Sequence, residues 1–580
     1  MANDSVTYSG IAKDFRRVRF QQRYEMLRNE YNLSWRMRHY DLKFFINPYR
    51  GFFEGFLPNR GDRRDMYIID STPKRAVRTL SALMMAGLTS PARPWFKLGV
   101  HDPDLANYPS VKYWLDTVTN RMLYVFSRSN IYQTLHNIYD ELSTFGTACA
   151  VIFEDYENVL RGQFFTVGEY YLACGPNSYV NTMCRKTWMT VKQLVEAFGI
   201  ENVSDSVRSA YENNVTDGPG AWREVIHMIE PNDDRISGLP GLKGKPFREV
   251  YWELGQNSEK FLSIKGYHEF PVIAPRWDVT NETDVYGKGP GWDALGDCKM
   301  LQRMQRDKLM ALEKVSNPPL QAHVSMRSES GVNALPGAVS YFSDSSPNAG
   351  VKPLYQVQPD LPGMVQALED VRAAIRSCFY ADLILMFTQG ELSKEMTAHE
   401  VIQRQNEQML QLGPVIERLE YECLDPLIKR SFNIMMRAGL LPPPPPEMHG
   451  VPLDVQYISI LAQAQKAVGT VGIEQLASFT GSLAAVFPEV LDAFDAIEAV
   501  TQYANNIGTP PKIIRSLDQI AAIQQQKAKQ MQQQQMMQNA MAAVQGAKVL
   551  SDTPVGQNSA LDALLGITGT NNSGGAAGAS

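Results

Sequence analysis

The fold is decided by the stretch Tyr286-Gly-Lys-Gly-Pro-Gly-Trp-Asp-Ala-Leu-Gly-Asp-Cys-Lys-Met-Leu301. Here a loop rich in glycine and proline is followed by a long segment almost free of helix-breaking residues. Glycines and a proline interrupt the chain between Gly287 and Gly291. From Trp292 to Val315 there is no proline and no glycine beyond Gly296, and the segment stops at Asn317-Pro-Pro319. This punctuation predicts one long helix.

The two faces of this predicted helix differ in chemistry. At α-helical spacing, one face is cationic and carries Lys299, Arg303, Arg306 and Lys314. The opposite face is apolar and carries Leu301, Met304, Ala311, Leu312 and Val315. We expect the apolar face to pack, and we expect the apolar stripes of the long helices to exceed what one subunit can bury.

Downstream, residues 318–360 contain apolar and β-branched pieces broken by glycine and proline, which predicts short strands and turns. A second helix is predicted from Pro362 to Phe379. The apolar run Leu383-Ile-Leu-Met-Phe387 then leads into a turn. A new helix is predicted from the capping box Thr397-Ala-His-Glu400 onward, with a kink at Gly413-Pro414.

The C-terminal part changes composition twice. Five consecutive prolines, Pro442 to Pro446, indicate an extended spacer before a smaller helical region at 453–520. From residue 521 the chain is rich in Gln, Met, Ala and Lys and then in Gly, Ala and Ser. We expect residues 521–580 to be largely disordered, with Ile520 to Lys548 as a frayed helix.

Upstream, the first forty residues alternate arginines with aromatic and aliphatic residues, which is typical of an amphipathic surface helix; direct contact with nucleic acid is the alternative. Thr72-Pro73 predicts a helix start, with Thr72 as the N-cap. Between Val100 and Tyr286 the patterns are mixed. Helices are predicted near 113–126 and 132–143 and strands near 148–153, 225–229 and 250–254, so the fold class is α+β.

The bulk composition excludes several classes of protein. With 580 residues, 44% hydrophobic and 20% charged residues, the chain is long enough for several buried cores. Its formal net charge of −6 argues against a protein that wraps nucleic acid through an overall basic surface. The six cysteines lack metal-ligand spacing, and no apolar run is long enough to cross a bilayer. We expect a protein made in the cytoplasm, without membrane insertion of its own.

The sequence carries no recognisable catalytic motif. Gly241-Leu-Lys-Gly-Lys-Pro246 has proline where a phosphate-binding loop needs Ser or Thr, and His399-Glu400 lacks the second histidine of a zinc protease. There is also no GxSxG serine motif. His136, Cys149 and His268-Glu269 form no pattern that singles them out. We therefore expect no enzyme, no catalytic residue, no metal and no cofactor.

Three stretches, in this order and spacing, resemble the head-to-tail connecting, or portal, protein family of short-tailed bacteriophages (podoviruses). The resemblance covers about residues 10–520. It rests on Asp70–Leu98, on Tyr286–Leu301 with the helix running to Pro319, and on Met396–Val401 with Gly413-Pro414 and Gly439–Pro442. Each stretch is weak alone, and together they are specific.

The resemblance implies a portal fold, whose subunits assemble as a dodecameric ring with a central DNA channel. It places an α+β wing at 1–286, stem helices at 287–316 and 361–382, and a small β-containing clip at 317–360. It further implies a channel loop at 383–395, a long kinked wing helix at 396–440, a proline-rich linker at 441–452, an α-helical crown at 453–520 and a tail at 521–580.

The implied function is a virion component at the capsid portal vertex, used in DNA packaging and viral genome ejection. The implied partners are double-stranded DNA, the terminase large subunit, tail adaptor proteins, and scaffold and major capsid protein. The candidate DNA-facing residues are Lys299, Arg303, Arg306, Leu385, Met386, Phe387 and Lys394.

Several alternatives stay open. The cationic face of the first stem helix either lines the channel or forms salt bridges between subunits, with acidic residues such as Asp307 or Glu313. The apolar run at 383–387 either projects into the channel or packs as core. A ring-forming tail or baseplate protein is the rival class, and a nuclease subunit, which would need a metal-binding cluster, is a second.

Overall fold

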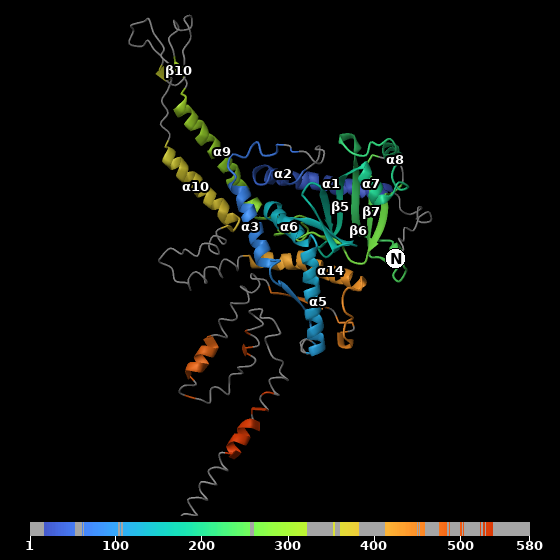
Figure 1. The fold of residues 1–580 in the computed structure, drawn as a ribbon. Coiled ribbons are helices and arrows are strands. Elements are labelled where there is room, and N and C mark those ends of the chain that lie inside the picture. Colours follow the sequence, from blue (N-terminus) through green and yellow to red (C-terminus); the bar gives the residue numbers. More distant parts are fainter. Residues whose placement is uncertain are drawn as a thin grey trace, which may run out of the picture. The chain divides into compact units, whose positions relative to one another are not determined.

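A computed structural model describes residues 17–52, 61, 63–102, 105, 108–255, 260–318, 320–321, 352–353, 360–381, 412–448, 450–451 and 453–458, with shorter pieces between 475 and 537. The chain divides into two compact units, Met1–Val471 and Gly472–Ser580. Nearly all described elements belong to the first unit, which mixes helices and strands (Figure 1). The predicted α+β class is therefore confirmed at this coarse level.

The largest sheet of the described residues has five antiparallel strands in the order β4-β5-β6-β7-β8. Its strands are β4 (Tyr170–Cys174), β5 (Val180–Thr190), β6 (Trp222–Pro231), β7 (Phe247–Glu253) and β8 (Ser263–Tyr267). The short helical turns η1 (Pro219–Ala221) and η2 (Leu242–Gly244) lie in its connections. The predicted strands near 225–229 and 250–254 are confirmed as parts of β6 and β7.

Both faces of this sheet are covered by helices. Trp252 of β7 packs against Phe20 of α1 (Arg17–Ser34), whereas the next residue along, Tyr251, packs against Phe198 of α7 (Val191–Phe198). Successive strand residues point to opposite faces, so α1 and α7 lie on opposite sides. Helix α8 (Asp205–Glu212) shares a small apolar core with α7.

The arginine-rich start of the described chain is the expected amphipathic helix. Arg17 donates from Nη2 to the carbonyl oxygen of Glu253 at 2.6 Å, and Arg19 pairs with Asp233 at 2.7 Å. Arg23 lies 3.1 Å from a carboxylate oxygen of Glu230. Because these cations bind groups of the same chain, the geometry favours the surface-helix interpretation over nucleic-acid contact.

A second, three-stranded antiparallel sheet has the order β3-β2-β9. It contains β2 (Cys149–Asp155), β3 (Val159–Phe165) and β9 (Val272–Ile273). Helices α3 (Thr72–Leu88), α5 (Pro109–Arg128) and α6 (Ile131–Phe145) contribute to the same continuous core. The predicted helices near 113–126 and 132–143 and the strand near 148–153 are confirmed.

The glycine-rich loop at 287–291 has a packing reason. A Cβ atom on Gly291 would overlap the carbonyl oxygen of Thr144, and one on Gly287 would lie 2.6 Å from the carbonyl oxygen of Gly146. Gly146 itself has φ +84°, a left-handed conformation that ends α6. The chain can therefore enter α9 (Pro290–Ser316) only because both backbones lack side chains where they meet.

The start of α3 corrects one expectation. Thr72 is not the N-cap, because the helix already includes it and the capping position falls on Ser71, whose side chain makes no cap bond. Instead Oδ1 of Asp70 accepts hydrogen bonds from the backbone N–H and the hydroxyl of Thr72, at 2.9 and 2.6 Å. Pro73 occupies the first turn, as expected.

The described part of the third predicted helix is α13 (Gly413–Leu419), the π-helical turn η4 (Glu420–Leu424) and α14 (Asp425–Arg437). The kink at Gly413-Pro414 stays a prediction, because residues 382–411, which directly precede it, lie outside the described part. The π-turn was not predicted. A proline ring clashes with the carbonyl four residues earlier in a regular helix, and the wider turn directly before Pro426 relieves that clash.

The region after the prolines also corrects an expectation. Residues 453–457 do not begin a helical region but form the strand β12 (Leu453–Tyr457), antiparallel to β1 (Phe96–Val100). The alternation Leu-Asp-Val-Gln-Tyr has the period of a strand. Before it comes the short turn η5 (Pro446–Met448). Residues 475–483 are helical, as is the described piece 529–537 of the Gln-rich segment.

Within the described ranges, no helix combines the length and the apolarity needed to cross a membrane. All six cysteines are free thiols.

Candidate functional site

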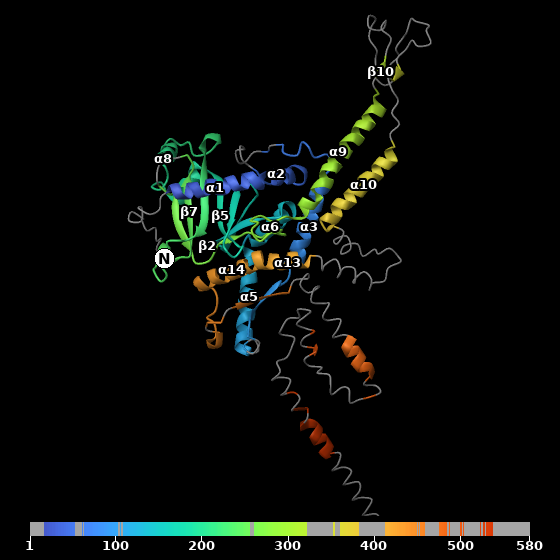
Figure 2. The same ribbon diagram turned by 180° about the vertical axis from the view of Figure 1, so that it is seen from behind.

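The candidate site is a pair of helices, α9 and α10 (Leu361–Cys378), which lie side by side in both views (Figures 1 and 2). Both helices occur where the sequence predicts them. Beyond the far end of α9, β10 (Leu320–Gln321) pairs antiparallel with β11 (Lys352–Pro353), which precedes α10. The two helices therefore run in opposite directions and are linked at one end.

A polar clasp joins both helices to the chain just before α3. Oε1 of Gln302 on α9 accepts the backbone N–H groups of Ile69 and Asp70 at 2.7 and 3.0 Å, and its Nε2 donates to the carbonyl oxygen of Asp70 at 2.8 Å. From α10, Arg372 donates from Nε and Nη2 to Oδ2 of Asp70 at 3.0 and 2.6 Å. Arg372 also pairs with Glu369 one turn away. We call Asp70, Gln302 and Arg372 the clasp.

The clasp has a defined charge state. Burial acts to raise the pKa of Asp70, but hydrogen bonds from Thr72 and Arg372 outweigh it and hold that pKa below its ordinary value. The hydrogen bond with Asp70 in turn raises the pKa of Arg372. An ionised carboxylate therefore faces a charged guanidinium at a site where Asp70 is only 7% exposed.

The predicted cationic residues of α9 lie on one side of the helix and have different surroundings. Lys299 donates to Oδ2 of Asp41 on α2 (Arg36–Phe45) at 2.7 Å. Arg303 donates to Asp307 one turn along at 3.1 Å. Arg306 is exposed, and no ion pair joins it to another described residue. We call Lys299, Arg303 and Arg306 the cationic row.

The expected apolar face of α9 is buried only in its first half. Ala294, Leu295, Cys298 and Leu301 are buried, but Leu312 and Val315 are 38% and 48% exposed. The expected packing of this face within the subunit is therefore found for its first half, and the second half leaves apolar surface that the subunit does not bury. This half of α9 projects from the α+β body together with α10 (Figure 1), so its exposed apolar side chains are open to contact with another molecule.

The outer side of α10 carries two acidic side chains and several small ones. Glu369 and Asp370 are exposed there beside Ala373, Ala374 and Ser377, whereas Leu368, Val371 and Ile375 are buried. We call Glu369, Asp370 and these three small residues the acidic face. The other predicted site residues, Leu385, Met386, Phe387 and Lys394, lie outside the described residues.

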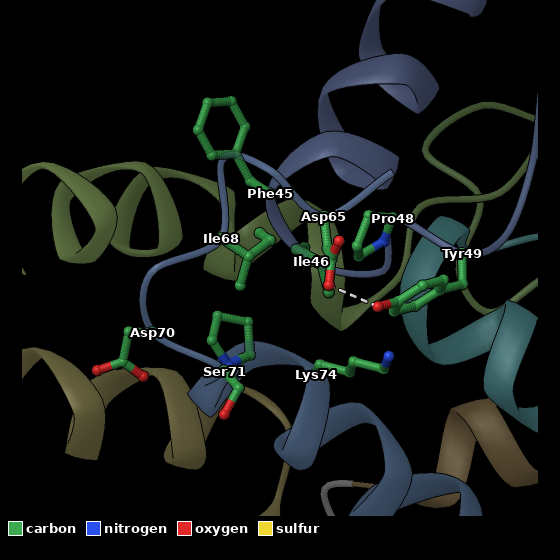
Figure 3. A pocket seen from close by; sticks show the side chains of 10 residues that line it. Phe45, Ile46, Pro48, Tyr49, Asp65, Ile68, Asp70, Ser71 and Lys74 are labelled. Carbon is green, nitrogen blue, oxygen red and sulfur yellow. Dashed lines mark hydrogen bonds between the residues drawn. The ribbon is translucent and has the colours of Figure 1, made fainter. Parts of the chain in front are cut away.

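A small cavity of about 130 Å³ lies where α2, α3 and the segment between them meet (Figure 3). Tyr49 donates to Oδ2 of Asp65 at 2.6 Å, and the ammonium of Lys74 lies 3.7 Å from the centre of the Tyr49 ring. Asp70 also lines the cavity but is held by Arg372. The lining residues include no thiol or imidazole, and both lining carboxylates are already held, Asp65 by Tyr49 and Asp70 by Arg372.

The residues considered for catalysis are not assembled into a site. Burial raises the pKa of the Cys149 thiol, which keeps it protonated, while His136 is exposed. Glu269 pairs with Arg437 at 2.6 Å and with Arg430 at 3.4 Å. The described side chains include no group of three or more His, Cys, Asp or Glu residues that could hold a metal ion.

The described part of the chain is thus an α+β body that carries a clasped pair of antiparallel helices. The chain belongs to the bacteriophage head-to-tail connecting protein family, which it matches over residues 17–514. It is 43% identical over 544 residues to the portal protein of Salmonella phage epsilon15, covering 94% of this chain and 97% of that protein. It is 39% identical over 558 residues to the probable portal protein of Bordetella phage BPP-1, covering 96% and 99%.

The resemblance read from the sequence is thereby confirmed, and the relatives' names support a phage portal or head-to-tail connector. Sequence reasoning missed the clasp. The signal available in the sequence was a glutamine, Gln302, next to Leu301 on a helix face that is otherwise buried.

Proposed function

We propose that this chain is the subunit of a dodecameric portal ring at the capsid vertex of a short-tailed phage. Double-stranded DNA passes through its channel into the procapsid during packaging and leaves through it on infection. The terminase motor docks on the ring first and tail adaptor proteins replace it. Scaffold and major capsid protein hold the ring in the shell. The subunit itself carries out no chemical reaction.

The observation that carries this proposal is the extent of the match. Identities of 43% and 39% extend over 97% and 99% of two proteins named as portal or probable portal. A similarity of this length extends over all the regions that we assign as wing, stem, clip and crown. It is not confined to a single shared domain. A locally similar protein of another function would match over a smaller part.

In this proposal α9 and α10 are the stem, the segment between them is the clip, and residues before 286 form the wing. The exposed second half of α9, with Leu312 and Val315, supports assembly, because apolar side chains on a long helix favour burial against a neighbour. The cationic row fits two placements, toward DNA in the channel or toward the next subunit.

The test is electron microscopy of the purified full-length chain, followed by a DNA packaging assay with phage lacking its own copy of the gene. We expect closed rings with a central opening wide enough for a duplex, and restored packaging. A chain that stays a 65.1 kDa monomer at micromolar concentration in several salts would contradict the proposal. Rings without such an opening would support the rival, a tail or baseplate protein.

A further inference from the structure

The helix pair α9–α10 carries opposite charges on its two outer sides. The cationic row of α9 comprises Lys299, Arg303 and Arg306, with the exposed Lys314 further along the same side. The acidic face of α10 presents Glu369 and Asp370. Neither Arg306 nor Asp370 has an ion-pair partner among the described residues. Each side therefore has unsatisfied charge that the other could match.

The two charged sides point away from each other. The buried residues Cys298 and Leu301 of α9 belong to the same continuous apolar core as the buried residues of α10, and the two helices pack along each other. At helical spacing, Arg303 lies on the side of α9 opposite Cys298 and its buried neighbours. Likewise Ala373 lies opposite the buried Leu368, Val371 and Ile375 of α10. The cationic row and the acidic face thus flank the pair.

The two charged sides also stand at the same level. Gln302 and Arg372 bind the same residue, Asp70, which sets a common height on the antiparallel helices. At about 1.5 Å of rise per residue, Arg303 and Arg306 lie about 1.5 and 6 Å beyond Gln302. In the same direction, Asp370 and Glu369 lie about 3 and 4.5 Å beyond Arg372. An arginine side chain easily spans the difference.

We propose that the cationic row of one subunit packs on the acidic face of α10 in the next subunit. This inference rests on the proposed ring and assigns its stem interface. A rotation about a ring axis leaves height along that axis unchanged, so groups at equal levels meet when the helices run along it. The small Ala373 and Ala374 let a second helix approach closely.

The surroundings of the row favour a protein partner over DNA. Met300 and Met310 are 44% and 47% exposed on the same side of α9, between and beside the basic residues. Apolar side chains are stabilised when contact with another protein removes them from water, whereas the charged phosphate oxygens of DNA provide no apolar surface to pack against.

The test is a charge swap in the full-length chain with Arg306→Glu and Asp370→Lys, both exposed positions. Alone, each variant places like charges at every interface, so the concentration that gives half-assembled rings should rise about tenfold. Mixed at equal amounts, the two variants should assemble as alternating rings, because each interface then joins opposite charges. Arg306→Gln and Asp370→Asn should have intermediate effects. Sedimentation and electron microscopy measure all of these.

The matched control is Lys192→Glu and Glu196→Lys, two exposed charges on α7, for which each variant and the mixture should assemble like the original chain. If Arg306→Glu alone assembles normally while DNA packaging or retention falls, the row faces DNA and the inference is wrong. If the original chain forms no rings, the proposed function fails. The inference is then judged separately by whether the mixture associates more strongly than either variant alone.

Discussion

Arg372 of α10 donates two hydrogen bonds to one carboxylate oxygen of Asp70, a residue 302 positions earlier in the chain, at 3.0 and 2.6 Å. Gln302 of α9 binds the backbone of the same aspartate. A single residue in the segment before α3, Asp70, thus holds both helices of the pair in position. Because a salt bridge that loses one buried partner leaves an unpaired charge, this contact should be sensitive to mutation.

Replacing Arg372 by Met should therefore loosen the helix pair. We expect a loss of about 3 kcal/mol of local stability, because the Asp70 carboxylate stays buried without its guanidinium. Hydrogen exchange at the amides of Ile69 and Asp70 and along α10 should speed up. Arg376→Met, one turn along the same helix, is the control and should change exchange little. The double variant Asp70→Asn with Arg372→Met should recover part of the loss. Equal protection in Arg372→Met and the original chain would contradict a role for the clasp.

Two glycines in α9 should respond oppositely to alanine. At Gly291 the added methyl group would overlap the carbonyl oxygen of Thr144, so the melting temperature should fall, with a cost of about 1–3 kcal/mol or more. At Gly296 nothing lies within 4 Å of the position of a Cβ atom, so alanine should stabilise the helix by about 1 kcal/mol. Calorimetry of both variants measures the contrast. A Gly291→Ala protein as stable as Gly296→Ala would show that the close approach of α6 and α9 is wrong.

Acid should destabilise the body of the subunit partly through His227. Burial lowers the pKa of this histidine to about 4, despite its hydrogen bond with Glu249, whereas its ordinary value is 6.5. As the pH falls, this histidine is therefore protonated in the unfolded chain before it is protonated in the folded one. Its contribution to the stability of the folded state is full above pH 6.5 and is lost as the pH falls toward 4. Over that window we expect a loss of up to about 3 kcal/mol in the free energy of unfolding.

His227→Gln should remove this part of the pH dependence, since glutamine can both accept from Arg185 and donate to Glu249 without titrating. The exposed His136→Gln is the control and should keep the original slope. Thermal melting of the three proteins between pH 7 and pH 4 is the measurement. Parallel curves for all three would show that His227 does not carry the effect.

The apolar run at 383–387 distinguishes a channel loop from core. If it projects into the channel, replacing Leu385, Met386 and Phe387 by Ser should leave ring assembly and melting temperature nearly unchanged while DNA packaging or retention falls. If these side chains are buried, each replacement should cost about 2–5 kcal/mol and the rings should fail or melt early. Electron microscopy, calorimetry and a packaging assay separate the outcomes. Loss of assembly would rule out the channel-loop assignment.

The sequence by itself determined the family, the α+β class, the positions of α3, α5, α6, α9 and α10, and those of three strands, β2, β6 and β7. Helices such as α9 and α10 follow from the spacing of apolar residues and the placement of proline and glycine, which act within a few neighbouring residues. The loop at 287–291 was recognisable for the same reason. Strand β12 was also readable in its alternation, but the preceding prolines and the helical pattern expected after them concealed it.

Only the tertiary structure decided which polar groups meet. Asp70 and Arg372 are 302 residues apart, and Arg276 and Glu422, which pair at 2.6 Å, are 146 apart, so no local pattern relates them. The exposure of Leu312 and Val315 was equally hidden, because periodicity identifies an apolar face but not what covers it. A helix is specified by residues a few positions apart, whereas burial and ion pairing depend on segments that the folded chain brings together from far away.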